Sequence, residues 1–161
     1  MKTPAAPHKP ARSTRRAAKK ALVVSSVVLQ HMAAPAESHH APALVQSVQK
    51  GLPFSEVETL GHKLDVPLDQ LAIHLGVARA TLHRRKVSGQ LGSEESDKVL
   101  RFARLLGQAA QIFGSEENAR QWLKSPQQGL GGAVPLEFAR TEVGAREVEA
   151  LLGRIDYGVY S

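Results

Sequence analysis

The stretch from Leu68 to Lys86 reads LDQLAIHLGVARATLHRRK and predicts two short helices joined by a tight turn. Its first half places apolar residues at positions i, i+3, i+4 and i+7, which is the spacing of one helical face. Gly76 follows, where a glycine can end a helix in the left-handed conformation. A second helix is expected to begin near Arg79, with Leu82 as its apolar anchor and cations over the rest of its surface. This order is typical of a helix-turn-helix.

The second helix of this unit carries the side chains that we expect to contact DNA. In a helix-turn-helix this helix enters the major groove, where guanidinium groups match guanine edges and phosphates. The candidate DNA-binding residues are Arg79, Thr81, His83, Arg84, Arg85 and Lys86. Arg84 and Arg85 are both expected to touch phosphates. The alternative is an ordinary helical hairpin with a solvated basic face. Ala78 weakens the pattern, because Ser or Thr at that position would cap the helix and stabilise it by about 1 kcal/mol.

Helical patterns flank this unit on both sides. Before it, Val57, Leu60 and Leu64 form one apolar stripe, and Pro67 suits the first position of the next helix. After it, a helix of about 20 residues is expected to begin with Ser93 as its cap. The apolar stripe of this long helix is broad enough to serve both a core and a dimer partner.

The C-terminal part continues with shorter elements. Gly114 is expected to end the long helix, and Ser115 to cap a short helix that carries Trp122 on its apolar side. Residues 127–134 form a Gly-rich turn that lacks the phosphate-loop motif G-x-x-x-x-G-K-[ST]. Pro135 is expected to open another helical turn.

A final helix is expected near residues 145–157, with Gly158 placed to close it. No segment alternates between apolar and polar residues for long enough to predict a strand. We therefore expect an all-α body, in which a helix-turn-helix bundle is followed by a small helical domain.

The basic residues gather at the N-terminus. Seven of the 21 Lys and Arg lie in the first 20 residues, whereas the remaining 14 face 15 Asp and Glu. A basic arm on a nearly neutral body suits contact with a polyanion such as nucleic acid. The alternative is a leader without such a partner, and residues 1–50 are expected to be mostly disordered.

The apolar run from Ala21 to Leu29 resembles the core of a signal peptide. It is too short to span a bilayer as a helix, so we expect no membrane partner. A short added helix or strand, or a start codon placed too early with Met32 as a later candidate, are the alternatives. The chain has no cysteine, which excludes disulfides and thiolate metal sites and fits a cytoplasmic location.

The sequence offers no catalytic or cofactor motif. His8, His31, His39 and His40 lack companion ligands at helical spacing, so no metal site is expected. The motifs HExxH and G-x-S-x-G and a dinucleotide fingerprint are absent. We therefore expect a protein that binds partners and is not an enzyme.

Two motifs stand in order along the chain. Residues 54–90, with TLHRR at 81–85 as their most distinctive part, resemble an Xre-type helix-turn-helix. Residues 117–161 carry the pattern Trp-Leu…Pro…Leu-Gly-Gly…Pro-Leu…Thr…Gly…Val…Leu-Leu…Arg-Ile…Tyr-Gly. This pattern resembles the C-terminal domain of the Xre/MbcA/ParS antitoxins. The resemblance predicts a DNA-binding and dimerisation region at 51–113 and a toxin-binding domain at 114–161. The basic arm at 1–50 is not part of the resemblance and is expected from composition alone.

The resemblance implies a homodimeric antitoxin that neutralises a RES-domain toxin, an enzyme that consumes NAD. It also implies binding to operator DNA and repression of its own operon. In this family the final residues reach towards the entrance of the toxin's NAD site. The toxin-binding candidates are accordingly Arg154, Tyr157, Gly158, Val159, Tyr160 and Ser161.

Two alternatives remain for the C-terminal end. Tyr157 could pack on Trp122 while the tail frays, and the chain could be a stand-alone regulator without a toxin. A fold-keeping role is expected for Trp122, Leu123, Gly131, Gly132 and Pro135.

Overall fold

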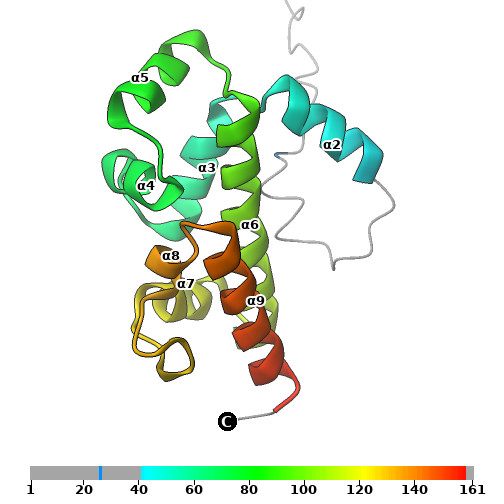
Figure 1. Cartoon of the computed structure of the whole chain (residues 1–161), viewed down its shortest axis with the longest axis vertical. Helices are drawn as coiled ribbons and strands as arrows, with labels where there is room; N and C mark the ends of the chain where they lie inside the picture. The colour runs from blue at the N-terminus through cyan, green and yellow to red at the C-terminus, as the bar shows by residue number, and fades with distance from the viewer. Residues whose placement is uncertain (1–25, 27–40, 159–161) are drawn as a thin grey trace, which may run out of the picture.

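The computed structural model describes Ser26 and residues 41–158, and these residues form a helical body (Figure 1). The elements are α2 (Ala41–Lys50), α3 (Ser55–Leu64), α4 (Leu68–Leu75), α5 (Arg79–Ser88), α6 (Ser93–Phe113), α7 (Glu116–Lys124), the 3-10 helix η1 (Gln128–Leu130), α8 (Pro135–Phe138) and α9 (Glu142–Asp156). Within the described residues the only β pairing consists of isolated bridges, so the all-α expectation is confirmed. The basic arm, the apolar run at 21–29, and His8, His31, His39 and His40 lie outside the part described, except for Ser26.

Several expected helix boundaries are confirmed by their local geometry. Gly76 and Gly114 follow α4 and α6 in the left-handed conformation, with φ of 61° and 75°. The Ser115 hydroxyl caps α7 by accepting a hydrogen bond from the Asn118 amide at 3.1 Å. Pro135 opens α8, where its missing N–H leaves no helical bond unmade.

Other boundaries differ from the expectation by a few residues. Ser93 is the first residue of α6 and Gly92 occupies the cap position, so the side chain of Ser93 does not cap the helix. Pro67 takes the cap position of α4 and not its first helical position. The last helix starts at Glu142 and not near Ala145, because the Thr141 hydroxyl caps it by accepting from the Gly144 amide at 3.1 Å.

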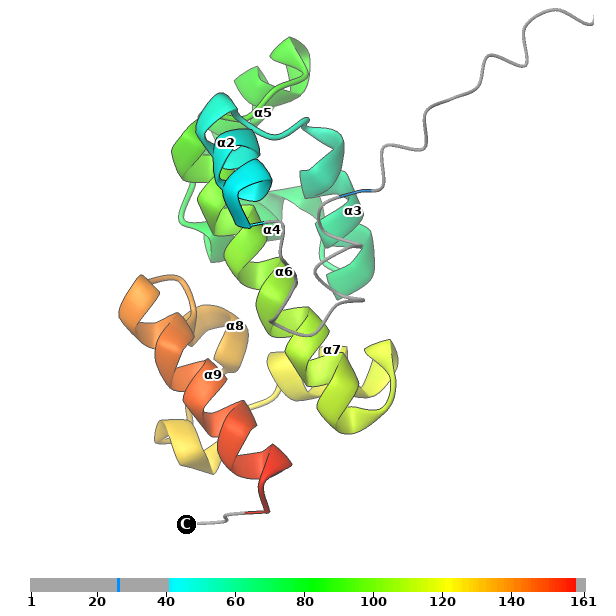
Figure 2. The same cartoon turned by 90° about the vertical axis from the view of Figure 1, so that its right-hand side faces the viewer.

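Helix α2 shows that the last ten residues of the expected arm, 41–50, are helical. Its Leu44 and Val48 are four residues apart and half-buried, whereas the described side chains on its other faces are exposed. The helix lies against α6, as Figure 2 shows. Ten residues of the expected arm therefore belong to the folded body.

Helix α6 is the central element of the fold. It packs against α2, α3 and α4 of the N-terminal half and against α7 and α9 of the C-terminal half (Figure 2). Val99, Phe102, Leu105 and Leu106 are buried along it, within one cluster of buried residues that runs from Leu52 to Leu152. The apolar stripe of α6, which the sequence shows to be broad enough for a core and a dimer partner, packs against helices of both halves of the chain.

Polar contacts join the two halves beside this core. Lys63 at the end of α3 forms an ion pair with Glu116 of α7, with Nζ and Oε1 2.7 Å apart. The Lys124 ammonium of α7 donates to the backbone carbonyl of Asp65 at 2.7 Å. Asp65 is the non-glycine residue with positive φ among those described, at 52°. Cations of α7 therefore satisfy carbonyl groups where α3 ends.

The side chain of Ser96 in α6 connects the start of this helix to the backbone that precedes α3. Its hydroxyl accepts from the buried Leu52 amide at 2.8 Å and donates to the Gly92 carbonyl at 2.7 Å. Ser96 is fully buried, and its backbone N–H also donates to the Gly92 carbonyl at 3.0 Å. The hydroxyl is therefore needed chiefly as the acceptor for the buried Leu52 amide.

We expect Ser96→Ala to lower the free energy of unfolding by about 1–3 kcal/mol, because it leaves the Leu52 amide buried without an acceptor. Urea denaturation followed by circular dichroism measures this change. The matched control is Ser47→Ala, which removes an exposed hydroxyl bond to the Ala43 carbonyl. Equal effects of the two substitutions would contradict the structural role of Ser96.

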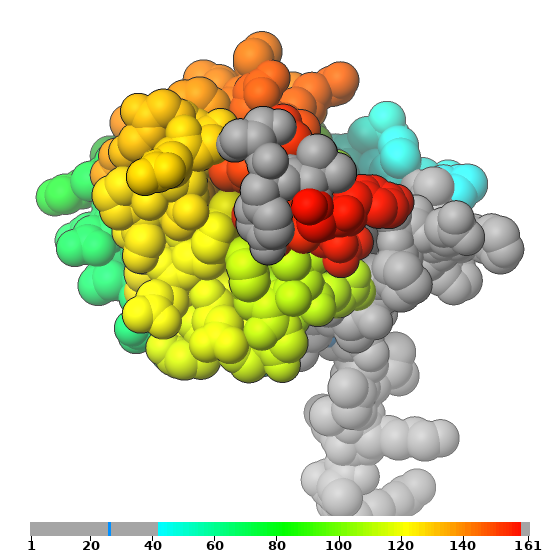
Figure 3. Space-filling view, turned by 90° about the horizontal axis from the view of Figure 1, so that it is seen from below, coloured from blue at the N-terminus to red at the C-terminus, as the bar shows by residue number. Residues whose placement is uncertain are grey.

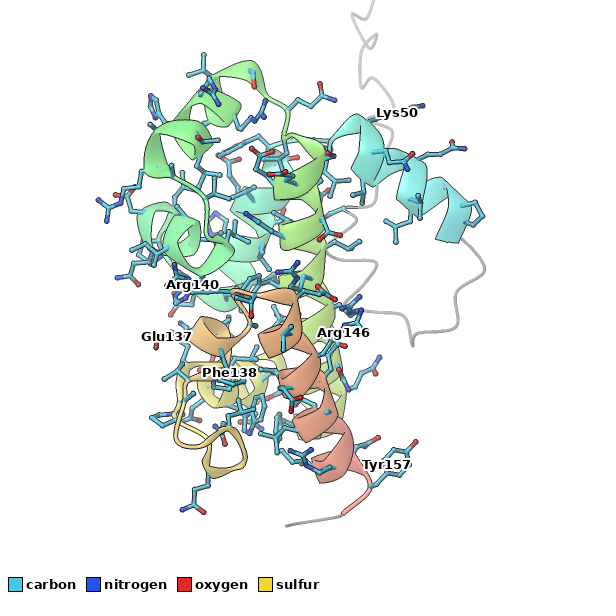
Figure 4. The ribbon with its side chains drawn as sticks, viewed as in Figure 1. Lys50, Glu137, Phe138, Arg140, Arg146 and Tyr157 are labelled. Atoms are coloured by element: carbon cyan, nitrogen blue, oxygen red, sulfur yellow. The ribbon has the colours of Figure 1, made fainter. Side chains whose placement is uncertain are left out.

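His74 lies at the junction of α4 with the C-terminal half. Among the described residues its buried Nδ1 has no hydrogen-bond partner. Burial lowers the pKa of His74 below its ordinary value of 6.5, and the charges of Arg140 and Lys124 act in the same direction, whereas Glu137 opposes them. Figure 4 places Glu137 and Arg140 just below α4. The folded protein therefore favours the neutral imidazole.

We expect this group to make the fold less stable as the pH falls. Because the pKa of His74 is lower in the folded than in the unfolded state, its contribution is fully present above pH 6.5 and is lost as the pH drops through the folded pKa. Urea denaturation at pH 7.5 and at lower pH checks this, and His74→Gln should flatten the dependence. The exposed His62→Gln is the control; a flattening by His62→Gln and not by His74→Gln would contradict the assignment.

Candidate functional site

Helices α4 and α5 form the expected helix-turn-helix. They contact each other across a turn of residues 76–78, and Leu82 is the buried residue that anchors α5. Ala78 stands at the cap position of α5 in an extended conformation and makes no side-chain cap bond, as the sequence indicates. The helix ends at Gly89, which has a φ of 75°. Helix α5 thus has one side fixed in the core and the other side free of the fold.

The structure leaves most of the predicted DNA-binding side chains exposed along α5. Arg79, His83, Arg84 and Lys86 are exposed, whereas Thr81 is half-buried. Lys86 lies 3.6 Å from Glu58, as measured between Nζ and Oε1, and both side chains are about half exposed. Such an exposed ion pair contributes little to the stability of the fold, and it leaves the ammonium group of Lys86 accessible.

Arg85 differs from these residues because it is paired inside the protein. Its Nη2 lies 3.3 Å from Oε1 of Glu95, whose side chain is almost buried. The pair lies directly over Gly92, since a Cβ atom there would approach Glu95 Oε2 to 2.3 Å. Arg85 therefore fixes α5 to the first turn of α6. This gives Arg85 a positioning role that differs from its expected contact with phosphate.

The pairing of Arg85 with Glu95 is a contact that the sequence did not reveal. The place of Glu95 in the first turn of α6 suits the positive end of the helix dipole. The partner is ten residues earlier and in another helix, so no helical spacing connects them. The glycine at 92 was the only available signal, because its missing side chain makes the space for the pair.

At the other end of the molecule, α9 brings Tyr157 to the surface. Tyr157 caps the helix and Gly158 follows with a φ of 70°. The Tyr157 side chain is 84% exposed, and Figures 3 and 4 show the end of α9 and this residue at the surface. Of the other toxin-binding candidates, Arg154 is half-buried, and Val159, Tyr160 and Ser161 lie outside the described residues.

The alternative that Tyr157 packs on Trp122 is wrong. Trp122 contacts Phe113 instead, with ring centroids 5.4 Å apart. Leu123 and Pro135 are buried, and Gly131 and Gly132 adopt φ values of 66° and 85° in the turn before α8. These residues have the fold-keeping roles that the sequence indicated.

The two surfaces lie far apart. Figure 1 shows α5 at one end of the long axis and the C-terminal end of α9 at the opposite end. Within residues 41–158 and Ser26, no group of three or more His, Asp or Glu side chains is arranged to hold a metal ion. None of the described helices has the length and apolar character needed to cross a membrane.

Comparison with known proteins finds a match for each half of the chain. Residues 43–104 match the antitoxin Xre-like helix-turn-helix domain, and residues 108–158 match the antitoxin Xre/MbcA/ParS C-terminal toxin-binding domain. The border between the two matched regions falls inside α6, the helix that the two halves share.

Three relatives extend the similarity over most of the chain. Antitoxin Xre of Yersinia enterocolitica is 32% identical over 120 residues, which cover 73% of this chain and 81% of the relative. Antitoxin Xre of Photorhabdus laumondii is 31% identical over 126 residues, or 77% and 85% of the two chains. The Prs ADP-ribosylating antitoxin of a Sphingobium species is 27% identical over 124 residues, or 71% and 78%. The helix-turn-helix, the C-terminal helices and these relatives together identify the chain as a member of the Xre/MbcA/ParS family of antitoxins.

Proposed function

We propose that this antitoxin neutralises a RES-domain, NAD-consuming toxin with its C-terminal end and represses its own operon by binding operator DNA through α5. The observation that carries the proposal is the exposed Tyr157 at the end of α9, at the opposite pole from α5. One molecule can then hold toxin and DNA without the two competing for the same surface.

The end of α9 has the properties of an anchor for a partner's cleft. An exposed tyrosine offers a large contact area and loses little side-chain entropy on binding. Gly158 follows the helix with its own backbone in the left-handed conformation, so the chain turns away from the helix axis at this residue. Arg154 lies one turn before Tyr157 and can pair with a carboxylate of the toxin. We propose that Val159, Tyr160 and Ser161 continue into the NAD site.

The family and one relative support the proposed reaction class of the toxin. The name of the Sphingobium protein joins an antitoxin with ADP-ribosylation of Prs. NAD is the donor of the ADP-ribose group in reactions of this class. A tail that enters an NAD site would block such a toxin whichever molecule receives the group.

The DNA-binding part of the proposal rests on the charge of α5. Its sequence RATLHRRKVS contains no acidic residue, and four of its basic side chains, Arg79, His83, Arg84 and Lys86, are exposed. This surface suits the phosphates and base edges of a major groove. We further propose that the protein acts as a homodimer in the cytoplasm and has no catalytic activity of its own. A stand-alone regulator would share α5 but would leave the exposed end of α9 without a partner.

Deletion of residues 157–161 should abolish neutralisation of the toxin while leaving DNA binding intact. The deletion removes the segment that we propose enters the toxin's NAD site, but none of the described residues of the buried core. Co-expression with the toxin encoded beside this chain, followed by growth of the cells, measures neutralisation.

Binding of the truncated protein to the promoter fragment, measured by fluorescence anisotropy, is the control for folding. Full growth rescue by the truncated protein would contradict the proposed role of the tail. Failure of the intact chain to rescue growth would instead favour the stand-alone regulator.

Arg84 and Arg85 should respond differently to substitution. We expect Arg84→Ala to reduce the salt slope of DNA binding, d log K against d log [salt], by about 1 unit, as for the loss of one phosphate contact. Arg85→Ala should instead lower the free energy of unfolding by about 1–3 kcal/mol, because Glu95 loses its charged partner in a nearly buried place. Titrations at several salt concentrations and urea denaturation separate the two effects. An equal slope change for both variants, with unchanged stability, would show that Arg85 contacts phosphate after all.

A further inference from the structure

Val87 is an exposed apolar residue of α5, and the other exposed side chains of this helix, apart from Ala80, are basic or polar. Its side chain is 79% exposed, so it takes no part in the core. Valine also has a lower helix propensity than Ala, Lys or Arg, because its branched side chain loses rotamer freedom against the preceding turn. Neither packing nor local helix stability therefore accounts for a valine at this position.

The spacing of α5 places Val87 on the face that is turned away from the fold. Ala80, Arg84 and Val87 are at i, i+4 and i+7 and form one stripe, on the side opposite the buried Leu82. His83 is adjacent to this stripe and is also exposed. Any molecule that contacts Arg84 and His83 will therefore meet the isopropyl group of Val87 as well.

The charge of α5 and the chemistry of the major groove indicate which group Val87 contacts. Helix α5 contains no acidic residue, so the partner that fits it is a polyanion such as DNA. In the major groove of DNA the base edges are polar except for one apolar group, the C5 methyl of thymine. An isopropyl group against a polar base edge would displace water without replacing its hydrogen bonds. Against a thymine methyl the same group buries apolar surface on both sides.

We propose that Val87 determines part of the operator sequence by contacting the C5 methyl group of a thymine in the major groove. The inference rests on the proposed binding of operator DNA by α5, and it adds a sequence preference to that function. It divides the outer face of α5 into a cationic part, which holds the phosphates and guanine edges, and an apolar part, which reads thymine.

The test replaces single thymines by deoxyuridine, which removes the methyl group and keeps every hydrogen-bonding atom of the base. The probe is the double-stranded fragment directly upstream of the reading frame of this chain, with the bound segment defined by footprinting. Each thymine of that segment is replaced in turn, and the Kd is measured for the full-length protein, Val87→Ala and Val143→Ala. Val143 is the matched control, because it is a 73% exposed valine at the start of α9, away from α5.

We expect at least one thymine whose replacement weakens binding of the full-length protein and of Val143→Ala about fourfold, as for the loss of one buried methyl contact. At that thymine the replacement should have no effect on Val87→Ala. Equal penalties in all three proteins, or no penalty at any thymine, would overturn the contact while leaving DNA binding by α5 in place. No footprint on the fragment would remove the DNA-binding proposal itself, and this inference with it.

Discussion

The burial of α6 between two sets of helices is the constraint on which the rest of the structure depends. One helix of 21 residues gives apolar side chains to the helix-turn-helix half and to the C-terminal half, so neither half has a complete core without it. The halves therefore cannot be regarded as domains on a flexible linker. A protein of this size gains from such sharing, because a separate core for each half would bury too little apolar surface to be stable alone.

The polar contacts beside α6 fix the orientation that the shared core allows. Cations of α7 reach carbonyl groups at the end of α3, and Arg104 of α6 pairs with Glu149 of α9 at 2.6 Å. These contacts lie between α5, the proposed surface for DNA at one pole, and the end of α9, the proposed surface for the toxin at the other (Figure 1). A partner bound at either pole is thereby held at a defined distance and angle from the other pole. Coupling between the two would have to pass through α6 and its neighbours.

Much of this arrangement was available from the sequence, and the missing part has a physical cause. Glycines at 76 and 114 and the apolar spacing around Leu71 and Val99 are local signals, and they predicted the elements correctly. The width of the α6 stripe was also visible, but a stripe does not reveal whether its second side meets the same chain or another copy. The pairing of Arg85 with Glu95 and the burial of His74 arise between helices, so no local spacing encodes them. Helix α2 was missed because its short apolar pattern becomes favourable only against α6.

The exposure of Tyr157 is a consequence of how the few aromatic residues are placed. The chain has one Trp, four Phe and two Tyr, and the ring of Trp122 is already in contact with Phe113 at the base of α6 and α7. The contact between Trp122 and Phe113 fills the space beside the end of α6, so the core does not need a further ring from α9. Tyr157 is left outside, where its large surface is unfavourable in water and becomes favourable once a partner covers it. The same packing that completes the fold thus leaves Tyr157 exposed at the end of α9, where we propose that the toxin binds.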